Sequence, residues 1–229
     1  MSTPIVIIST ISAREALHDI APEFEKASGY KVDVTYGQGP VLAKSIAEGM
    51  PGDVFVGPEV FSGPLIEAGR LAGASRTAFA SSSTALAVKA GIPKPDISTP
   101  EKLKAFLLAA KGVSYSAGVS GIHFVKAMEK LGIADEIAAK RIAAKPGELI
   151  GAVVARGEAD VAIQQPSELM PVEGIAIVGP LPEALQEPMI YGATAFSGSK
   201  HDAGNRAFMD YLRSEPARKV LRHCGLDPV

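Results

Sequence analysis

Short apolar segments rich in β-branched residues alternate with helical segments, and this alternation restricts the possible folds more than any other feature. Residues 4–9 (PIVIIS) predict a buried strand, and an apolar face at helical spacing predicts a helix over 12–28. Residues 29–36 and 53–56 predict two further strands, separated by a short helix at 41–49. A β-α-β-α-β order with short glycine-rich connections predicts a parallel sheet with helices on both faces.

A second β-α-β set occupies roughly residues 85–185. Between the two sets, a helix at 58–69 is expected to break at Gly63-Pro64, because proline lacks the N–H group that a helix interior needs. The chain is expected to close with a helix over 202–225, interrupted at Glu215-Pro216. The other expected elements are helices at 99–110, 120–132 and 146–158, and strands at 113–116, 159–165 and 175–182.

Two extended segments, 77–91 and 187–196, link the two sets, and the second segment returns the chain to the first set. The predicted fold class is therefore α/β, with two parallel-sheet-based domains joined by two hinge strands. Domain I is expected at 1–82 and 190–229, and domain II at 83–189. Open parallel sheets bind ligands beyond the carboxyl ends of their strands, so we expect a ligand cleft between the two domains.

Composition excludes several classes of function. The net charge is -2 and no basic run appears, so we expect no nucleic-acid partner. The single cysteine, Cys224, permits no intramolecular disulfide, and we expect it to be a packing residue. His18, His123, His201 and His223 show no metal-ligand spacing, so neither a metal nor a cofactor is expected.

No apolar stretch of 18 residues occurs in the sequence, so we expect no membrane-spanning helix. The N-terminal residues MSTPIVIIST contain neither a basic region nor a signal-peptide cleavage motif. We therefore expect a periplasmic protein if a signal peptide has been removed, and a cytoplasmic protein otherwise. A monomer is expected in either case.

Candidate ligand-binding residues in domain I lie where the predicted strands end. Ser12 is placed to cap the first helix, either purely as a cap or while also offering its hydroxyl to an anion. Arg14 lies in the first turn of that helix, where a cation opposes the helix dipole; it contacts an anion or forms a surface ion pair. Gln38 and Gly39 follow the second strand, where an amide and a backbone N–H could meet a ligand, or where the chain simply turns.

Candidates in domain II follow the same rule. Ser120 and Gly121 open a helix whose N-terminus suits an anion, and His123 lies in its first turn, where a structural role is the alternative. Gln164 and Gln165 end an apolar strand, and strand alternation should aim one of them at the cleft. Tyr191, in the returning extended segment, could belong to the core, the hinge or the ligand site.

The sequence resembles the bacterial molybdate-binding, type II periplasmic solute-binding proteins over nearly its whole length. The order and spacing of several segments together carry this resemblance, which implies a two-domain fold of the Venus-flytrap type and an ABC transporter permease as partner. The segments are SxxxALxDIAPxFE at 12–25, GQGPVLAKSIAEG at 37–49, PGDVFVGPE at 51–59, SGIHFVKAMEKLGI at 120–133, GELIGAVVARGEADVAIQQPSEL at 147–169 and AFMDYLRSEPARKVLRHCGLDP at 207–228.

The resemblance also implies that neutral hydroxyls and backbone N–H groups hold an oxyanion. The family's binding positions correspond here to Ser12, Gly39, Ser120, Gly147 and Gln165. The second turn usually carries serines but reads Gly-Gln-Gly-Pro here, and the usual tyrosine is replaced by glutamine. Amide donors and a guanidinium suit a larger, flatter anion, so we expect an organic carboxylate as the ligand.

An enzyme is the alternative, because the resemblance extends to aconitate isomerases, which shift a double bond in a tricarboxylic acid. Such a 1,3-proton shift needs a base beside an acidic C–H group, and donors that hold the carboxylates. Arg14 and the glutamines could supply the donors. The candidates for moving the proton are His123 and Glu148, although the sequence places neither of them against a substrate.

Overall fold

The computed structural model describes residues 3–145 and 147–229, and it divides the chain into two compact units. Unit 1 comprises Met1–Ser82 and Met189–Val229, and unit 2 comprises Ser83–Pro188. The chain therefore leaves the first unit once and returns to it once. Pro146, on which the predicted helix at 146–158 begins, lies outside the described residues.

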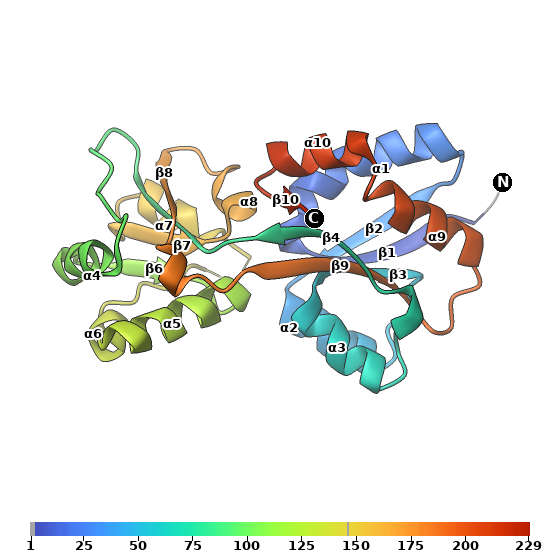
Figure 1. Ribbon diagram of the computed structural model, residues 1–229, viewed down its shortest axis with the longest axis horizontal. Coiled ribbons are helices and arrows are strands. Elements are labelled where there is room, and N and C mark those ends of the chain that lie inside the picture. Colours follow the sequence, from blue (N-terminus) through green and yellow to red (C-terminus); the bar gives the residue numbers. More distant parts are fainter. Residues whose placement is uncertain (1–2, 146) are drawn as a thin grey trace. The chain divides into compact units, whose positions relative to one another are not determined.

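Unit 1 is built on a six-stranded sheet in the order β10-β4-β9-β3-β1-β2 (Figure 1). β1 is parallel to both β2 and β3, whereas β9 is antiparallel to its neighbours β3 and β4, and β10 is antiparallel to β4. The strands are β1 (Ile5–Thr10), β2 (Val32–Gly37), β3 (Val54–Pro58), β4 (Thr77–Ser82), β9 (Met189–Ala195) and β10 (Asp227–Pro228).

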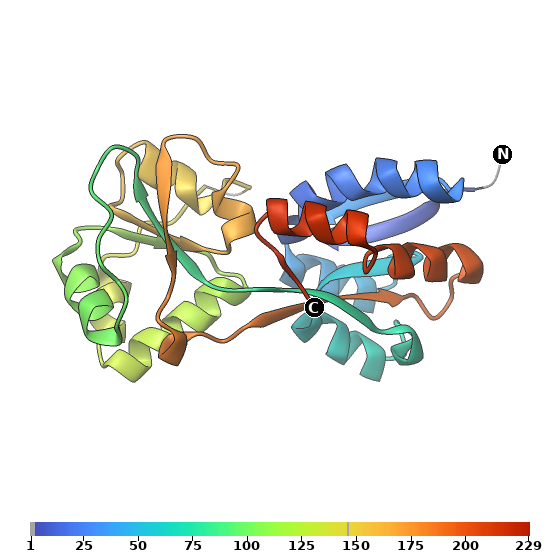
Figure 2. The same ribbon diagram turned by 45° about the horizontal axis from the view of Figure 1, so that its top comes forward.

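Helices cover both faces of this sheet, as the sequence predicts. α1, α9 and α10 lie together on one face, and α2 and α3 lie on the other (Figures 1 and 2). The helices are α1 (Arg14–Ser28), α2 (Gly39–Ala47), α3 (Glu59–Glu67), α9 (Asp202–Tyr211) and α10 (Glu215–His223), with short 3-10 turns at Ile11–Ala13 and Gly73–Ser75.

Unit 2 contains a four-stranded sheet in the order β6-β7-β5-β8. Only β6 and β7 are parallel, and β5 is antiparallel to both β7 and β8. The strands are β5 (Ala85–Lys89), β6 (Val113–Tyr115), β7 (Val161–Gln164) and β8 (Ile175–Pro180). The helices are α4 (Pro100–Ala109), α5 (Val119–Leu131), α6 (Ala134–Ala139), α7 (Ile150–Ala155) and α8 (Pro166–Leu169), with a 3-10 turn at Glu183–Leu185.

Alternation along β5 divides the core of unit 2 into two layers. Leu86 and Val88 pack with the apolar faces of α4, α5 and α6, whereas Ala85 and Ala87 pack with those of α7 and α8. Successive strand residues point to opposite faces, so four consecutive apolar residues serve two layers at once. In Figure 1 these two sets of helices lie on opposite sides of β6 and β7.

The predicted α/β class is confirmed, but both sheets are mixed rather than parallel throughout. Four antiparallel strands, β4, β5, β8 and β9, adjoin the points where the chain passes between units, and they enter or leave their sheets there without a crossover helix. The fifth, β10, follows α10.

Two helix predictions are wrong in detail. α3 runs through Gly63-Pro64 without a break. Pro64 lies on the exposed side, where water can bond the carbonyl that the missing N–H leaves unpaired. α7 covers Ile150–Ala155 alone, which is shorter than the predicted helix at 146–158.

Candidate functional site

The carboxyl ends of the parallel strands of unit 1 meet at one edge of its sheet. Thr10 at the end of β1 is paired with Gly37 at the end of β2, and β3 runs in the same direction beside β1. The edge beyond parallel strands is where open α/β sheets bind ligands. Four residues predicted from the sequence follow these strand ends: Ser12, Arg14, Gln38 and Gly39.

Ser12 does not cap the first helix, which corrects the sequence-based expectation. The 3-10 turn at Ile11–Ala13 separates β1 from α1, and Ala13 takes the capping position without a side-chain hydrogen bond. The Ser12 Oγ instead lies 3.0 Å from the Thr10 Oγ1, and both side chains are buried. When two hydroxyls bond each other, one proton still remains to be donated, so this pair can bind an anion.

Arg14 is the first residue of α1, and its Nε donates to Glu15 Oε1 at 3.0 Å. Its side chain is 43% exposed, so this ion pair contributes little to stability and can open for a ligand. Burial raises the pKa of the half-buried Tyr36 hydroxyl, while the positive charge of Arg14 acts in the opposite direction. Tyr36 therefore adds a hydroxyl to this edge that the sequence analysis missed, although its place at the end of β2 was a usable signal.

Gln38 precedes α2 as its capping residue, and its side chain makes no capping hydrogen bond. Gly39 opens the helix and is buried. A Cβ at this position would lie 2.3 Å from the Phe61 ring, so packing against α3 accounts for the glycine. Close approach of a ligand to the backbone is therefore not needed to explain this glycine.

A corresponding edge exists in unit 2, where β6 and β7 end and β5 begins. β5 is antiparallel to β7, and Ala85 pairs with Gln164, so the residue before β5 lies beside the end of β7. The segment after β6 leads into α5, whose N-terminus carries the predicted Ser120 and Gly121. Both parts of the chain that sequence reasoning selected in unit 2 thus meet at one edge.

A pair of hydroxyls marks the start of α5. The Ser116 and Ser120 Oγ atoms are 3.1 Å apart, and Ser116 Oγ also accepts from the Gly118 N–H at 3.2 Å. Ser120 is almost completely buried. A Cβ at Gly121 would lie 1.8 Å from the Ser116 carbonyl oxygen, so only glycine permits this tight turn. The N-terminus of a 13-residue helix together with two hydroxyls is suited to an anion.

The two glutamine amides converge on one carboxylate, that of Glu168. Gln164 Nε2 donates to Glu168 Oε1 at 2.8 Å, and Gln165 Nε2 donates to Glu168 Oε2 at 3.3 Å. Strand alternation predicts that the two amides point in opposite directions, which is wrong. β7 ends at Gln164, and Gln165 is already the capping residue of α8, so strand alternation no longer applies to it.

Two hydroxyls beside this cluster are buried and have no hydrogen-bond partner in the described part of the chain. They are Thr84 Oγ1, just before β5, and Ser167 Oγ, next to Glu168. An unpartnered buried hydroxyl costs on the order of 1–3 kcal/mol, so such groups call for an explanation. Their place at the edge of unit 2 makes them candidate donors to a ligand.

His123, a predicted proton carrier, lies on α5 with its Nε2 at 3.4 Å from Glu187 Oε2. Burial lowers the pKa of the imidazole, and the opposing charge of Glu187 offsets part of this effect. Lys126 Nζ also lies 3.3 Å from the same carboxylate. His123 therefore forms a small charged cluster with Lys126 and Glu187, next to the C-terminal residue of unit 2.

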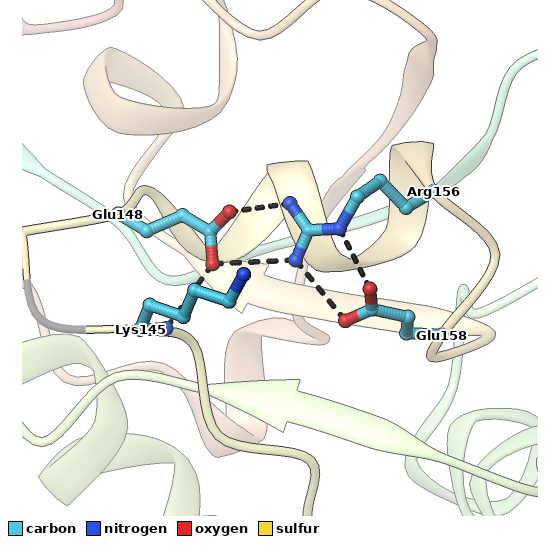
Figure 3. A network of polar contacts seen from close by, with 4 residues as sticks. All are labelled: Lys145, Glu148, Arg156 and Glu158. Carbon is cyan, nitrogen blue, oxygen red and sulfur yellow. Dashed lines mark hydrogen bonds and ion pairs between the residues drawn. The ribbon is translucent and has the colours of Figure 1, made fainter.

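Glu148, the other predicted proton carrier, is held in an ion-pair network (Figure 3). Arg156 bonds both Glu148 and Glu158, and Glu148 Oε2 also accepts from the Lys145 backbone N–H at 3.1 Å. The Arg156 guanidinium holds the pKa of the Glu148 carboxyl below its usual range. These bonds occupy the carboxylate, which weakens its candidacy as a base.

Two predicted residues remain, Gly147 and Tyr191, and Tyr191 pairs with Pro58 at the end of β3. Gly147 is exposed, with a φ of 79°, and lies in a turn before α7 rather than at its start. Tyr191 is completely buried in β9, and its ring centroid is 6.4 Å from that of Phe79 in an edge-to-face arrangement. Of the three roles considered for Tyr191, its burial favours the core of unit 1.

Among residues 3–145 and 147–229, no group of three His, Cys, Asp or Glu side chains is placed to hold a metal ion. None of the helices described is long and apolar enough to span a membrane. Cys224 is buried, and burial raises the pKa of its thiol, in agreement with the expected packing role.

Comparison with known proteins identifies relatives over almost the whole chain. The model of a family described as bacterial extracellular solute-binding protein matches residues 5–227. An aconitate isomerase from a Pseudomonas species is 34% identical, with 99% of this chain and 88% of the relative aligned. The molybdate-binding protein of Escherichia coli K12 is 26% identical, with 96% of this chain and 88% of the relative aligned.

A solved structure shows the same fold. The periplasmic molybdate-binding protein of Azotobacter vinelandii superimposes with a TM-score of 0.79 over 97% of this chain and 98% of its own, at 19% identity. This likeness confirms the predicted type II periplasmic-binding-protein fold.

Proposed function

Because the chain belongs to the bacterial extracellular solute-binding protein family, we propose that it binds a small organic anion carrying two or three carboxylates. The sheet edges of the two units are proposed to hold the same ligand. Unit 1 contributes Ser12, Arg14 and Gln38, and unit 2 contributes the N-terminus of α5 with Ser120. An ABC transporter permease, the partner that the resemblance implies, is part of this proposal for the case that the protein is exported.

The observation that carries the proposal is the pair of glutamine amides that bond Glu168. These amides already bind a carboxylate of the chain itself, with one donor to each oxygen. Amides and guanidinium groups match the planar shape of a carboxylate, and Arg14 supplies a guanidinium at the edge of unit 1. The donors thus suit planar carboxylates.

The same residues argue against molybdate. A compact tetrahedral oxyanion needs short donors that converge on one point, yet Gln165 replaces the tyrosine that the molybdate-binding resemblance implies. The Glu168 carboxylate would also repel a dianion that has no proton to share. An organic acid can turn a C–H or O–H group toward Glu168 while its carboxylates bind elsewhere.

A thermal-shift comparison tests this ligand class. Molybdate, tungstate and sulfate should be compared with citrate, cis-aconitate and trans-aconitate. A ligand present at 100 times its dissociation constant stabilises the folded protein by about 2.7 kcal/mol. We expect organic acids to raise the melting temperature most. A rise with molybdate and tungstate alone would show that the proposed ligand class is wrong.

A second candidate function is isomerisation of an unsaturated tricarboxylic acid by a 1,3-proton shift. The supporting observation is the 34% identity to an aconitate isomerase, against 26% to a molybdate-binding protein over similar lengths. Incubation of the purified protein with trans-aconitate, followed by chromatography, tests it directly. Appearance of the cis isomer would support the enzyme, and an unchanged substrate would exclude this isomerase activity.

A further inference from the structure

We propose that Glu168 is the residue that moves the proton at the edge of unit 2. This assignment rests on the second proposed function, the isomerase. It differs from the two sequence-based candidates, His123 and Glu148, and depends on how the chain around β7 fixes the carboxylate.

A chain of hydrogen bonds sets the orientation of Glu168. The Ile150 N–H donates to Gln164 Oε1 at 3.2 Å, so the oxygen of this amide must face α7. The amide nitrogen must then face Glu168 Oε1, which it meets at 2.8 Å. Gln165 supplies a second donor to the other oxygen, at 3.3 Å. The Ile150 N–H therefore fixes the orientation of the Gln164 amide. The amides of Gln164 and Gln165 together fix the orientation of the Glu168 carboxylate.

The surroundings of Glu168 favour contact with a substrate over a purely structural role for this carboxylate. Its neighbour Ser167 and the nearby Thr84 each hold a buried hydroxyl without a partner among the residues described. Gln164 and Gln165 are both about 4% exposed, whereas Glu168 is partly exposed. The glutamines therefore anchor the carboxylate from the protein side, and Glu168 is the member of this cluster that solvent or a ligand can reach.

The other acidic candidate is less suitable. Glu148 is bonded by the Arg156 guanidinium, and that bond would have to break before the carboxylate could take a proton. Gln164 and Gln165 instead hold the Glu168 carboxylate with one amide donor to each oxygen. A base in a fixed orientation is what proton abstraction from carbon requires.

The proposed reaction balances without a cofactor or an oxidant. A Glu168 oxygen takes a proton from the CH₂ carbon of the unsaturated acid, and the electron pair of that C–H bond forms a new C=C bond to the central carbon. The electron pair of the old C=C bond moves toward the far carbon and its carboxylate. The protonated Glu168 then returns the proton to that far carbon, which regenerates the carboxylate and leaves the double bond shifted.

The test compares Glu168→Gln with four other proteins: the wild type, Glu168→Asp, Glu148→Gln and Glu173→Gln. Glu173 lies exposed in unit 2, so Glu173→Gln makes the same chemical change away from both candidates. Each protein is incubated with trans-aconitate in D₂O, and NMR follows loss of the CH₂ proton signal and formation of the cis isomer. Calorimetry measures binding of trans-aconitate to each variant.

We expect Glu168→Gln to bind trans-aconitate at least as tightly as the wild type, because a negative charge is lost. Its exchange and isomerisation rates should fall by about 10²–10⁴-fold, the usual contribution of a general base. Glu168→Asp, which retains a carboxylate on a shorter side chain, should keep part of the activity. The exposed control variant should match the wild type, and Glu148→Gln should stay within a few-fold of it.

Several results would overturn the assignment. Full activity in Glu168→Gln, or loss of activity in Glu148→Gln alone, would contradict a proton-moving role for Glu168 and leave the isomerase function intact. Binding of trans-aconitate by the wild type without exchange or isomerisation would exclude the reaction but preserve the proposed organic-anion binding. Failure of the wild type to bind any organic acid would refute the proposed function itself.

Discussion

Arg14 is the charged residue that most directly separates an organic-anion site from a site of neutral hydroxyls. It occupies the first turn of α1, where the helix dipole disfavours a cation, and its ion pair with Glu15 is largely exposed. A guanidinium in such a position is available to a carboxylate, whereas the oxyanion site implied by the family resemblance contains only uncharged donors.

Replacing Arg14 with alanine should weaken binding of the best organic acid by roughly 1.5–3 kcal/mol, or about 10- to 150-fold in Kd. The physical reason is loss of a charge-assisted hydrogen bond to a carboxylate. Calorimetric titration measures the effect, and Lys26→Ala, which removes an exposed cation from the same helix, is the control. Equal affinities for wild type and Arg14→Ala would return Arg14 to the role of a surface charge.

His123 should make the stability of the protein sensitive to acid. Burial lowers its folded-state pKa below the ordinary value near 6.5, and the facing charges are those of Glu187 and Lys126. Between the folded and unfolded pKa values the unfolded chain binds more protons, so stability rises with pH across this window and falls on acidification.

The measurement is urea unfolding of wild type and His123→Gln between pH 5 and 7.5. We expect the wild type to lose more stability than the variant as the pH is lowered, because the variant has no imidazole to protonate on unfolding. Identical pH dependence in both proteins would mean that the imidazole titrates alike in the folded and unfolded states.

The sequence locates the segments of the site better than the roles of its residues. Ser12, Gln38, Ser120 and Gln165 all lie at sheet edges, because strand ends can be read from apolar runs. Their hydrogen bonds could not be predicted, since the 3-10 turn after β1 and the early end of β7 depend on local geometry. Glu168 was overlooked for the same reason, because only the folded chain shows both amides bonded to it.

At the scale of elements, turn chemistry explains most of the successful predictions. Thr99, the first residue of the helix predicted at 99–110, caps α4 by accepting from the Lys102 N–H, and Ser214 caps α10 after the interruption predicted near Glu215-Pro216. The short α6 and α8 and the two-residue β10 were missed. Such brief elements carry too few residues for a periodic pattern, and their formation depends on tertiary contacts.

Gly39, the first residue of α2, and Gly63, in the middle of α3, should respond oppositely to replacement by alanine. A Cβ at Gly39 would lie 2.3 Å from Phe61, so Gly39→Ala forces the ring to move and should cost about 1–3 kcal/mol. Gly63 lies inside α3 with nothing within 4 Å of a Cβ, so Gly63→Ala should stabilise by about 0.5–1 kcal/mol.

Denaturant unfolding of both variants checks the packing between these helices. Each substitution adds one methyl group to unit 1, so the chemical change is the same in both variants. Opposite signs of the change in unfolding free energy would therefore reflect the space available around each Cβ. If Gly39→Ala leaves the stability unchanged, α2 and α3 can adjust without loss of packing. Approach of a ligand to the backbone would then again be the explanation for the glycine.

At the scale of the whole molecule, the chain passes between units twice, at Ser82–Ser83 and Pro188–Met189. The two extended segments at 77–91 and 187–196 predict a chain that leaves its first domain and later returns to it. β4 and β9, which adjoin these connections, pair antiparallel over most of their length. A closely paired double connection is a suitable hinge, because few backbone angles need to change during closure.

If the ligand is held by both units, its binding should draw them together. We expect small-angle X-ray scattering to show a smaller radius of gyration with saturating ligand, approaching the value of about 17 Å for a compact 229-residue monomer. Arg14→Ala should show the same decrease only at proportionally higher ligand concentration, because its site is weakened but its hinge is intact. A radius that stays constant while calorimetry reports binding would place the ligand within a single unit and argue against closure.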